Sequence, residues 1–240
     1  MNKRCIVNVA TGDFYCKMQE RLVDSFYRTY DGVYECDEFT YPEFSRAEKA
    51  DYVGYGIDLL IWKDCLPPGS RPHSESPYGF KVHAIKAAYE RGYTSILWLD
   101  SPAYAVKEDI SPIFEKIEKE GYYAMSHIDP LENWVGEFTL IQFAMRRDLL
   151  KGYNLPSGSC YGFDLSKPHI ETLFDSFATK ERQGFFNSER ISENGWHRHD
   201  EAVLAMLLIQ FGLPVFTFDP LFQSDSPECV IKSGGGNDNY

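Results

Sequence analysis

The sequence predicts an α/β fold, in which a mainly parallel central sheet is flanked by helices. Two observations predict it. Short apolar runs alternate along the chain with longer segments that begin at helix-capping residues and end at glycine. The 240 residues are also 43% hydrophobic and 25% charged, which suits a single large core. Without a repeat or linker, we expect one domain over residues 1–232 and a flexible glycine-rich tail over residues 233–240.

Apolar runs bounded by turn residues predict the strands. The expected strands cover residues 4–10, 33–37, 57–62, 95–100, 122–125, 138–143, 160–165 and 215–218. The run at 95–100 is the clearest, because Ile96, Leu97, Trp98 and Leu99 lead directly into a carboxylate, Asp100.

Periodicity and capping residues predict the helices between these strands. An apolar stripe in the first helix falls on Met18, Leu22, Phe26 and Tyr30. Later helices are expected from Ser76-Pro77 to Gly92, from Ser111-Pro112 to Gly121, after Ser166, and over the apolar residues 202–210. Residues 66–72 and 181–196 are expected to be loops, because the first is rich in proline and the second is polar.

The charge balance restricts the partners. The chain carries 24 Lys and Arg against 36 Asp and Glu, a net charge of −12. This sign disfavours nucleic acid and anionic membrane surfaces as partners. No apolar run is long enough for a membrane span. The first apolar stretch is too short and too interrupted for the core of a signal peptide, so we expect none. The six cysteines form no CxxC pair, so we expect reduced thiols and a cytoplasmic protein.

Several common nucleotide and nucleophile motifs are absent from the sequence. It contains no Gly-x-Gly-x-x-Gly after the first strand, no Gly-x-x-x-x-Gly-Lys-Ser/Thr and no Gly-x-Ser-x-Gly. A dinucleotide site, a P-loop NTPase and a nucleophile elbow are therefore disfavoured. The zinc deaminase signature is missing as well.

Asp100 is the strongest single candidate for a functional residue. It follows a buried strand, and ligands of open α/β sheets bind at the carboxyl ends of strands. A carboxylate there holds a divalent metal or a ribose hydroxyl, or it is only a turn residue that accepts from backbone N–H groups. Lys81, in the first turns of the preceding helix, either attracts phosphate or is simply solvated.

Two further segments carry candidate groups. Residues 196–201 contain two histidines, Asp200 and Glu201 within a short span, which suits a metal ligand or a general base. The plainer interpretation is that Asp200 caps a helix and Glu201 complements its dipole. Asp164 ends another strand, either as a site residue or as a turn residue, and the small-residue loop 157–159 precedes that strand.

The order of three blocks resembles a GT-A type glycosyltransferase of the nucleotide-diphospho-sugar transferase superfamily. Residues 78–101 resemble the helix and strand that lead into the family's Asp-x-Asp motif. Residues 157–165 resemble the element that lines the acceptor side, and residues 199–204 resemble the acidic pair that opens a late helix. The resemblance implies a Rossmann-like GT-A domain that moves a hexose or pentose from a nucleotide-sugar to a glycan or other hydroxyl acceptor.

The resemblance also implies roles for individual residues. Asp200 would be the catalytic base, with Glu201 second. The donor would contact Thr11, Gly12, Lys81, Asp100 and Ser101. The acceptor would contact Gly158, Asp164 and Trp196. Rings such as Tyr15, Tyr78 and Trp196 would stack on the base or sugar, although each also suits plain core or surface.

Pro102 stands where the family motif has its second acidic residue. Proline cannot bind a metal, so a Mn²⁺ or Mg²⁺ site would need Asp100 together with His199, or with His197 or Asp219. Without a metal, Lys81 or Arg198 would offset the charge of the leaving diphosphate. Two alternatives stay open: a catalytically inactive sugar- or nucleotide-binding module on the same fold, and a phage-type sugar transferase acting on DNA. Both retention and inversion of configuration are compatible with these residues, and the oligomeric state is not specified.

Overall fold

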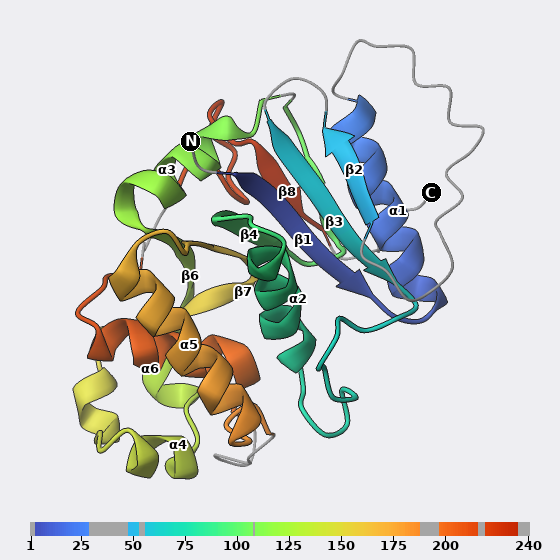
Figure 1. Cartoon of the computed structure of the whole chain (residues 1–240). Coiled ribbons are helices and arrows are strands. Elements are labelled where there is room, and N and C mark those ends of the chain that lie inside the picture. Colours follow the sequence, from blue (N-terminus) through green and yellow to red (C-terminus); the bar gives the residue numbers. More distant parts are fainter. Residues whose placement is uncertain are drawn as a thin grey trace.

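The computed structural model describes residues 3–28, 48–52, 56–107, 109–187, 197–215 and 219–234. Within these residues, a six-stranded sheet in the order β2-β3-β1-β4-β7-β6 lies between helices on both faces (Figure 1). The strands are β1 (Arg4–Ala10), β2 (Glu48–Tyr52), β3 (Ile57–Lys63), β4 (Ser95–Leu99), β6 (Tyr122–Pro130) and β7 (Asn154–Asp164).

Four of the six strands run in the same direction, so the sheet is mainly parallel as predicted. Strand β1 pairs in parallel with β3 on one side and with β4 on the other. Strands β2 and β7 run the opposite way, and β6 returns to the direction of β4 because it is antiparallel to β7. The carboxyl ends of β1, β3 and β4 therefore meet at one edge, where ligands of open α/β sheets bind.

Alternation along the strands gives each face of the sheet its own core. Cys5, Val7 and Val9 of β1 face one cluster, while Ile6 between them faces the other. The first cluster packs under α2 (Gly79–Glu90), α5 (Pro168–Arg182) and α6 (His199–Gln210). The second packs under α1 (Asp13–Arg28), α3 (Ser111–Glu120) and a small sheet of β5 (Ala103–Ala105) with β8 (Ile231–Ser233).

A third, smaller cluster lies beyond α6. It joins α6 to η1 (Leu131–Asn133), α4 (Glu137–Gln142) and η2 (Arg147–Leu150), through Leu131, Leu140, Leu150 and Met206. Helix α6 is consequently covered nearly all round, which explains why its residues 202–208 are apolar without a polar face.

Most of the predicted elements are confirmed. The strands expected at 4–10 and 57–62 match β1 and β3, and the strand expected at 95–100 matches β4, which ends one residue earlier at Leu99. Met18, Leu22 and Phe26 are buried as one stripe of α1. Glycines at two predicted helix ends have φ values of 86° for Gly92 and 95° for Gly121, a conformation that favours glycine. Tyr30, the strand expected at 33–37 and residues 216–218 lie outside the described residues.

One predicted strand is wrong. Residues 138–143 form helix α4 and the turn after it instead of a strand. An apolar run predicts a strand here, but only Thr139 and Leu140 of the segment are buried. Phe138 and Ile141 are exposed, so burial does not alternate along the segment as it does in a half-buried strand.

Two predicted helix starts are displaced because their serines bond elsewhere. Helix α2 begins at Gly79, after Tyr78 in a left-handed conformation, and Ser76 Oγ donates to Glu181 at 2.5 Å. Helix α5 begins at Pro168, and Ser166 Oγ donates to Asp164 at 2.5 Å. Residues 181 and 182, expected in a loop, belong to α5, and residues 188–196 lie outside the described residues.

Two other sequence expectations concern the whole chain. The five cysteines with described positions are free thiols, as expected. None of the described helices is both long and apolar enough to cross a membrane. Of the expected tail, Ser233 ends β8 and residues 235–240 lie outside the described part of the chain.

Candidate active site

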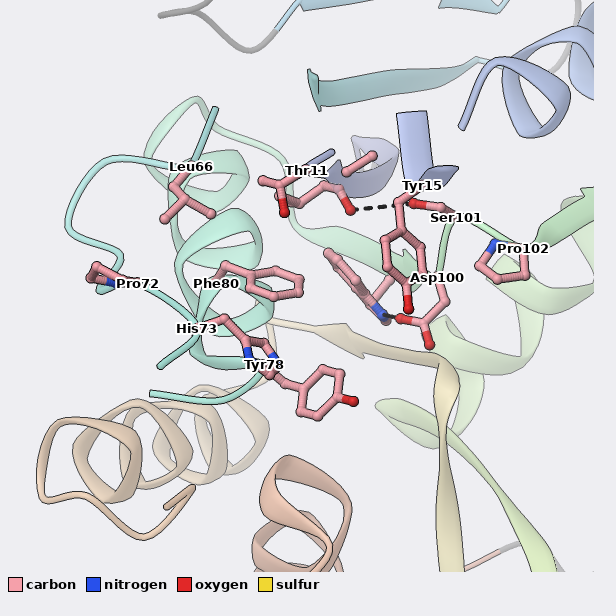
Figure 2. A pocket seen from close by; sticks show the side chains of 13 residues that line it. Thr11, Tyr15, Leu66, Pro72, His73, Tyr78, Phe80, Asp100, Ser101 and Pro102 are labelled. Carbon is pink, nitrogen blue, oxygen red and sulfur yellow. Dashed lines mark hydrogen bonds between the residues drawn. The ribbon is translucent and has the colours of Figure 1, made fainter. Parts of the chain in front are cut away.

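A pocket of about 620 Å³ opens at the carboxyl ends of β1 and β4 (Figure 2). Val9 and Ala10 at the end of β1 and Thr11 after it line the pocket, as do residues 100–102, which follow β4. A loop between β3 and α2 contributes Leu66, Pro72 and His73 to its wall. Rings dominate the remaining surface, which is formed by Tyr15, Tyr78, Phe80 and Trp98. The pocket therefore suits a ligand with a planar ring or an apolar sugar face.

Asp100 is the carboxylate that lines this pocket, and 27% of its side chain is exposed. Figure 2 shows it reaching toward the space between the rings of Tyr15 and Tyr78. Its backbone N–H donates to Ser159 O at 2.9 Å, and its carbonyl accepts from Ala103 N at 2.9 Å, so a tight turn fixes it. Trp98 Nε1 donates to its Oδ1 at 2.9 Å. The turn and ligand interpretations of Asp100 are thus compatible.

Lys81 lies behind Asp100 and is almost fully buried. Its Nζ lies 3.1 Å from Asp100 Oδ1 and 3.2 Å from Asp200 Oδ2, and it donates to Gly158 O at 2.8 Å. Burial alone would lower the pKa of Lys81, but the carboxylates of Asp100, Asp200 and Glu201 outweigh it and raise the pKa above its ordinary value. Lys81 is consequently an internal cation and does not line the pocket as a solvated lysine would.

Asp200 and Glu201 stand side by side in the first turn of α6 but have different environments. Asp200 is 3% exposed, and burial raises its pKa to about 7 despite the nearby charge of Lys81. Its Oδ2 faces the Lys81 ammonium at 3.2 Å. Glu201 Oε1 accepts from Gly158 N at 2.8 Å, and Oε2 accepts from Arg198 Nε at 2.9 Å. Neither residue is the N-cap, which is Arg198.

The remaining donor-side predictions fall around the pocket. Thr11 and Ser101 line it, and Ser101 Oγ donates to Val9 O at 3.3 Å. Gly12 lies next to Thr11, where its N–H donates to Asp64 Oδ1 at 2.8 Å. The structure therefore brings Thr11, Gly12, Asp100 and Ser101 to one sheet edge, with Lys81 beneath.

On the acceptor side, the structure separates the predicted residues. Gly158 contacts Lys81 and Glu201 through its main chain. It lies inside β7, whereas the sequence predicts a loop at 157–159. Asp164 lies at the opposite edge of the sheet, because β7 runs antiparallel to β4 and pairs Asp164 with Ser95. There its Oδ1 accepts from Ser166, which is the turn role considered for it. Trp196 lies outside the described residues.

The two histidines of the 196–201 segment form hydrogen bonds with main-chain groups of other segments. His197 Nδ1 accepts from Gly136 N at 3.1 Å, so its Nε2 carries the proton toward Phe185 O at 2.9 Å. Burial lowers the pKa of His197 to about 4, which keeps it neutral. His199 Nδ1 lies 2.7 Å from Phe186 O, and its ring lies beside Tyr78. Burial also lowers the pKa of His199.

These contacts do not fit a divalent cation at Asp100. Within the described ranges, no three His, Cys, Asp or Glu side chains are grouped to hold a metal. Asp219 is buried elsewhere, where it pairs with Lys116 and accepts from Leu221 N at 2.8 Å. Pro102 offers only its carbonyl, which accepts from Arg21 Nη2 at 2.6 Å.

Sequence reasoning missed the residue that fixes the pocket wall. Glu181 of α5 has a side chain that is 1% exposed, and it accepts from Ser76 Oγ at 2.5 Å and from Arg71 Nη2 at 2.8 Å. His83 Nε2 lies 3.4 Å from its other oxygen. Burial would raise the pKa of Glu181, but these three partners together lower it to about 2. No local pattern reveals this role, because the partners are a hundred residues away.

Comparison with known proteins supports the fold assignment. Neither a protein-family model nor a curated protein matches the sequence. Among solved structures, a glycosyltransferase involved in the glycosylation of the major capsid of PBCV-1 is similar over 98% of this chain and 93% of its own. The two are 12% identical, with a TM-score of 0.52.

Two further structures have the same fold. Mouse xyloside xylosyltransferase 1 is 12% identical over 99% of both chains, with a TM-score of 0.51. The WbbM bifunctional glycosyltransferase is 11% identical over 99% of this chain, with a TM-score of 0.53, and this chain covers 46% of it. The GT-A-like fold inferred from the three sequence blocks is therefore confirmed along the length of the chain.

Proposed function

We propose that this chain is a glycosyltransferase that moves a sugar from a nucleotide-sugar donor to an acceptor hydroxyl. One observation carries the proposal: in a fold shared with three glycosyltransferases, a ring-lined pocket with a partly exposed carboxylate, Asp100, opens at the carboxyl ends of β1 and β4. Rings that face an open pocket suit a nucleotide base, and Asp100 suits ribose or sugar hydroxyls.

The reaction requires an acceptor oxygen to bond to the sugar C1 while the bond from C1 to the diphosphate oxygen breaks. If configuration is inverted, a carboxylate takes the proton of the acceptor hydroxyl. Asp200 is the base that we propose for this step. One property supports it: burial raises its pKa to about 7, near the optimum for a general base at neutral pH, although Lys81 Nζ lies 3.2 Å from its Oδ2.

Glu201 is the less suitable base, because both of its oxygens accept hydrogen bonds within the protein. We assign it a positioning role for the main chain of Gly158. The negative charge of the leaving diphosphate also needs a cation. Arg198 suits this task better than Lys81, because 46% of its side chain is exposed whereas Lys81 is enclosed.

A binding module without transferase activity is the second candidate. The observation that favours it is the engagement of Lys81 and Glu201 in contacts within the protein, together with proline at position 102. Both candidate functions require ligand binding in the same pocket, but only a transferase turns the ligand over.

A panel of nucleotide-sugars tests the proposal by thermal shift and by release of nucleoside diphosphate. We expect one donor to raise the melting temperature, because it binds only the folded chain. Asp100→Ala is expected to abolish that shift, whereas Asp148→Ala, an exposed control, keeps it. Slow release of the diphosphate, lost in Asp200→Asn with binding retained, supports transfer. Binding without release supports the module, and no shift with any donor contradicts both.

A further inference from the structure

We infer that the ammonium group of Lys81 occupies the cation position between Asp100 and Asp200, in place of a divalent metal. The inference deepens the proposed function, since it assigns this site a built-in cation. It depends on the contacts among the side chains of Lys81, Asp100 and Asp200 and the carbonyl of Gly158, and not on which sugar is bound.

Three oxygens from three elements surround the Lys81 nitrogen. Asp100 Oδ1 lies 3.1 Å away at the end of β4, and Asp200 Oδ2 lies 3.2 Å away on α6. Gly158 O on β7 accepts its hydrogen bond at 2.8 Å. Two carboxylates and a carbonyl are the oxygen donors that a Mg²⁺ or Mn²⁺ site uses. Here they converge on an ammonium nitrogen that is tethered to α2.

The surroundings of the nitrogen favour an ammonium group over a hydrated metal ion. The rings of Tyr78, Trp98 and Tyr161 have their centroids 4.9, 5.4 and 6.0 Å from Nζ. Ring faces stabilise a desolvated monovalent cation through their quadrupoles, but they supply no ligands to a metal. The side chain of Lys81 is 3% exposed, so it does not swing out to vacate the position without opening this packing.

One carboxylate oxygen of Asp100 is already engaged. Its Oδ1 accepts from Trp98 Nε1 at 2.9 Å in addition to facing Lys81. A dication on the remaining oxygen would approach the fixed positive charge of Lys81. Two residues further on, Pro102 brings no side-chain oxygen, and its carbonyl accepts from Arg21. The position of the Lys81 ammonium group and the proline at 102 thus independently disfavour a divalent metal at Asp100.

A Mn²⁺ titration monitored by electron paramagnetic resonance tests the inference without a nucleotide-sugar. The method detects binding because bound Mn²⁺ loses the signal of the free ion. We expect the native chain to have no Mn²⁺ binding that depends on Asp100. Asp100→Asn should therefore bind Mn²⁺ no less than the native chain does. Lys81→Met keeps an unbranched side chain of similar length and removes its charge. It is expected to gain Mn²⁺ affinity of about tenfold or more, because the two carboxylates lose their counterion.

Two controls define the result. Lys86→Met changes an exposed lysine on the same helix and is expected to bind no additional Mn²⁺. Lys81→Met combined with Asp100→Asn should lose the gained affinity. Mn²⁺ binding by the native chain that depends on Asp100 would overturn the inference, as would a folded Lys81→Met chain without gained affinity. If Lys81→Met does not fold, the native chain and Asp100→Asn decide the question.

The donor panel separates this inference from the proposed function. If a donor raises the melting temperature equally with EDTA and with Mn²⁺, both are supported. If the shift requires Mn²⁺, the proposed function stands and the inference fails. If no donor binds and the native chain still binds no Mn²⁺ through Asp100, the proposed function fails and the assignment of the cation position stands.

Discussion

The main-chain N–H of Gly158 donates to Oε1 of Glu201 at 2.8 Å, and a Cβ atom at Gly158 would lie 2.7 Å from that same oxygen. Only glycine allows this approach, because real Cβ atoms do not come so close to their neighbours. The carbonyl of Gly158 also accepts from Lys81 at 2.8 Å. One backbone position therefore joins the acidic turn of α6 to the buried cation.

Gly158→Ala is expected to displace Glu201 and to lower the free energy of unfolding by about 1–3 kcal/mol, the usual cost of overpacking. Urea unfolding measures this effect. The double variant with Glu201→Ala should lose less than the sum of the two single changes, because the clash is gone. Ser159→Ala, one position along β7, serves as the control. Additive losses would contradict the proposed contact.

Asp200→Asn is expected to change how stability depends on pH. Burial raises the pKa of Asp200 to about 7, so between about pH 4 and pH 7 the folded chain keeps a proton that the unfolded chain has released. Rising pH in this window lowers the free energy of unfolding of the native chain. The stability of Asp200→Asn relative to native should increase across the window and stay constant above it. Asp148→Asn should show no such trend.

The same variant bears on the proposed base. The rate of diphosphate release by the native chain is expected to rise with pH through an apparent pKa near 7, as Asp200 loses its proton. In Asp200→Asn this rise should disappear along with most of the turnover. A rise that survives the substitution would assign the titration to another group.

Glu181→Gln is expected to loosen the pocket wall. The change removes the charge that holds Ser76 and Arg71, and we expect a loss of about 1–3 kcal/mol in the free energy of unfolding, as for hydrogen bonds to a buried charged group. Because the partners lower the pKa of Glu181 to about 2, its contribution is present above about pH 4 and is lost as pH falls toward 2.

The wall itself gives a second readout for Glu181. Amide hydrogen exchange of residues 66–78 should accelerate in Glu181→Gln, and donor affinity should fall more than the melting temperature alone explains. Glu171→Gln on the same helix removes the charge of the carboxylate that accepts from Tyr89 and leaves the wall intact, so it is the matched control. Equal exchange in both variants would show that Glu181 acts only on stability.

Tyr15→Ala is expected to weaken donor binding about threefold to tenfold, the loss of one aromatic stacking contact. Tyr15 lines the pocket and half of its side chain is exposed, so its removal should change affinity more than stability. Tyr15→Phe should bind like the native chain, and Tyr153→Ala, an exposed tyrosine outside the pocket lining, should have no effect. Isothermal titration calorimetry measures the dissociation constants. Equal binding by Tyr15→Ala would place the donor base elsewhere.

The sequence predicts those parts of the fold that local physics decides. Apolar alternation places β1 and β4, and glycines with positive φ end α2 and α3. Asp100 is predictable for the same reason, since a strand end is a local feature. Serine caps fail at Ser76 and Ser166 because a hydroxyl has several possible acceptors, and only the fold decides which acceptor is near.

The parts of the site that depend on strand direction are not predictable in this way. Asp164 ends a strand as Asp100 does, but β7 runs antiparallel to β4, so the two carboxylates lie at opposite edges of the sheet. Likewise, the sequence does not reveal that Lys81 points inward, or that His197 accepts from Gly136. Both outcomes depend on contacts between residues far apart in the chain.

The turn that presents Asp100 is held from behind by distant segments. Arg21 of α1 and Gly234, next to β8, both donate to the carbonyl of Pro102, at 2.6 and 3.3 Å. Ala103, whose N–H closes the turn on Asp100, is fully buried and begins the strand that pairs with β8. Opening this turn means separating α1, β5 and β8 together. We therefore expect the amide hydrogen of Ala103 to exchange with solvent only when the whole domain unfolds. The Asp100 carboxylate would then lie on one of the parts of the chain that open most rarely.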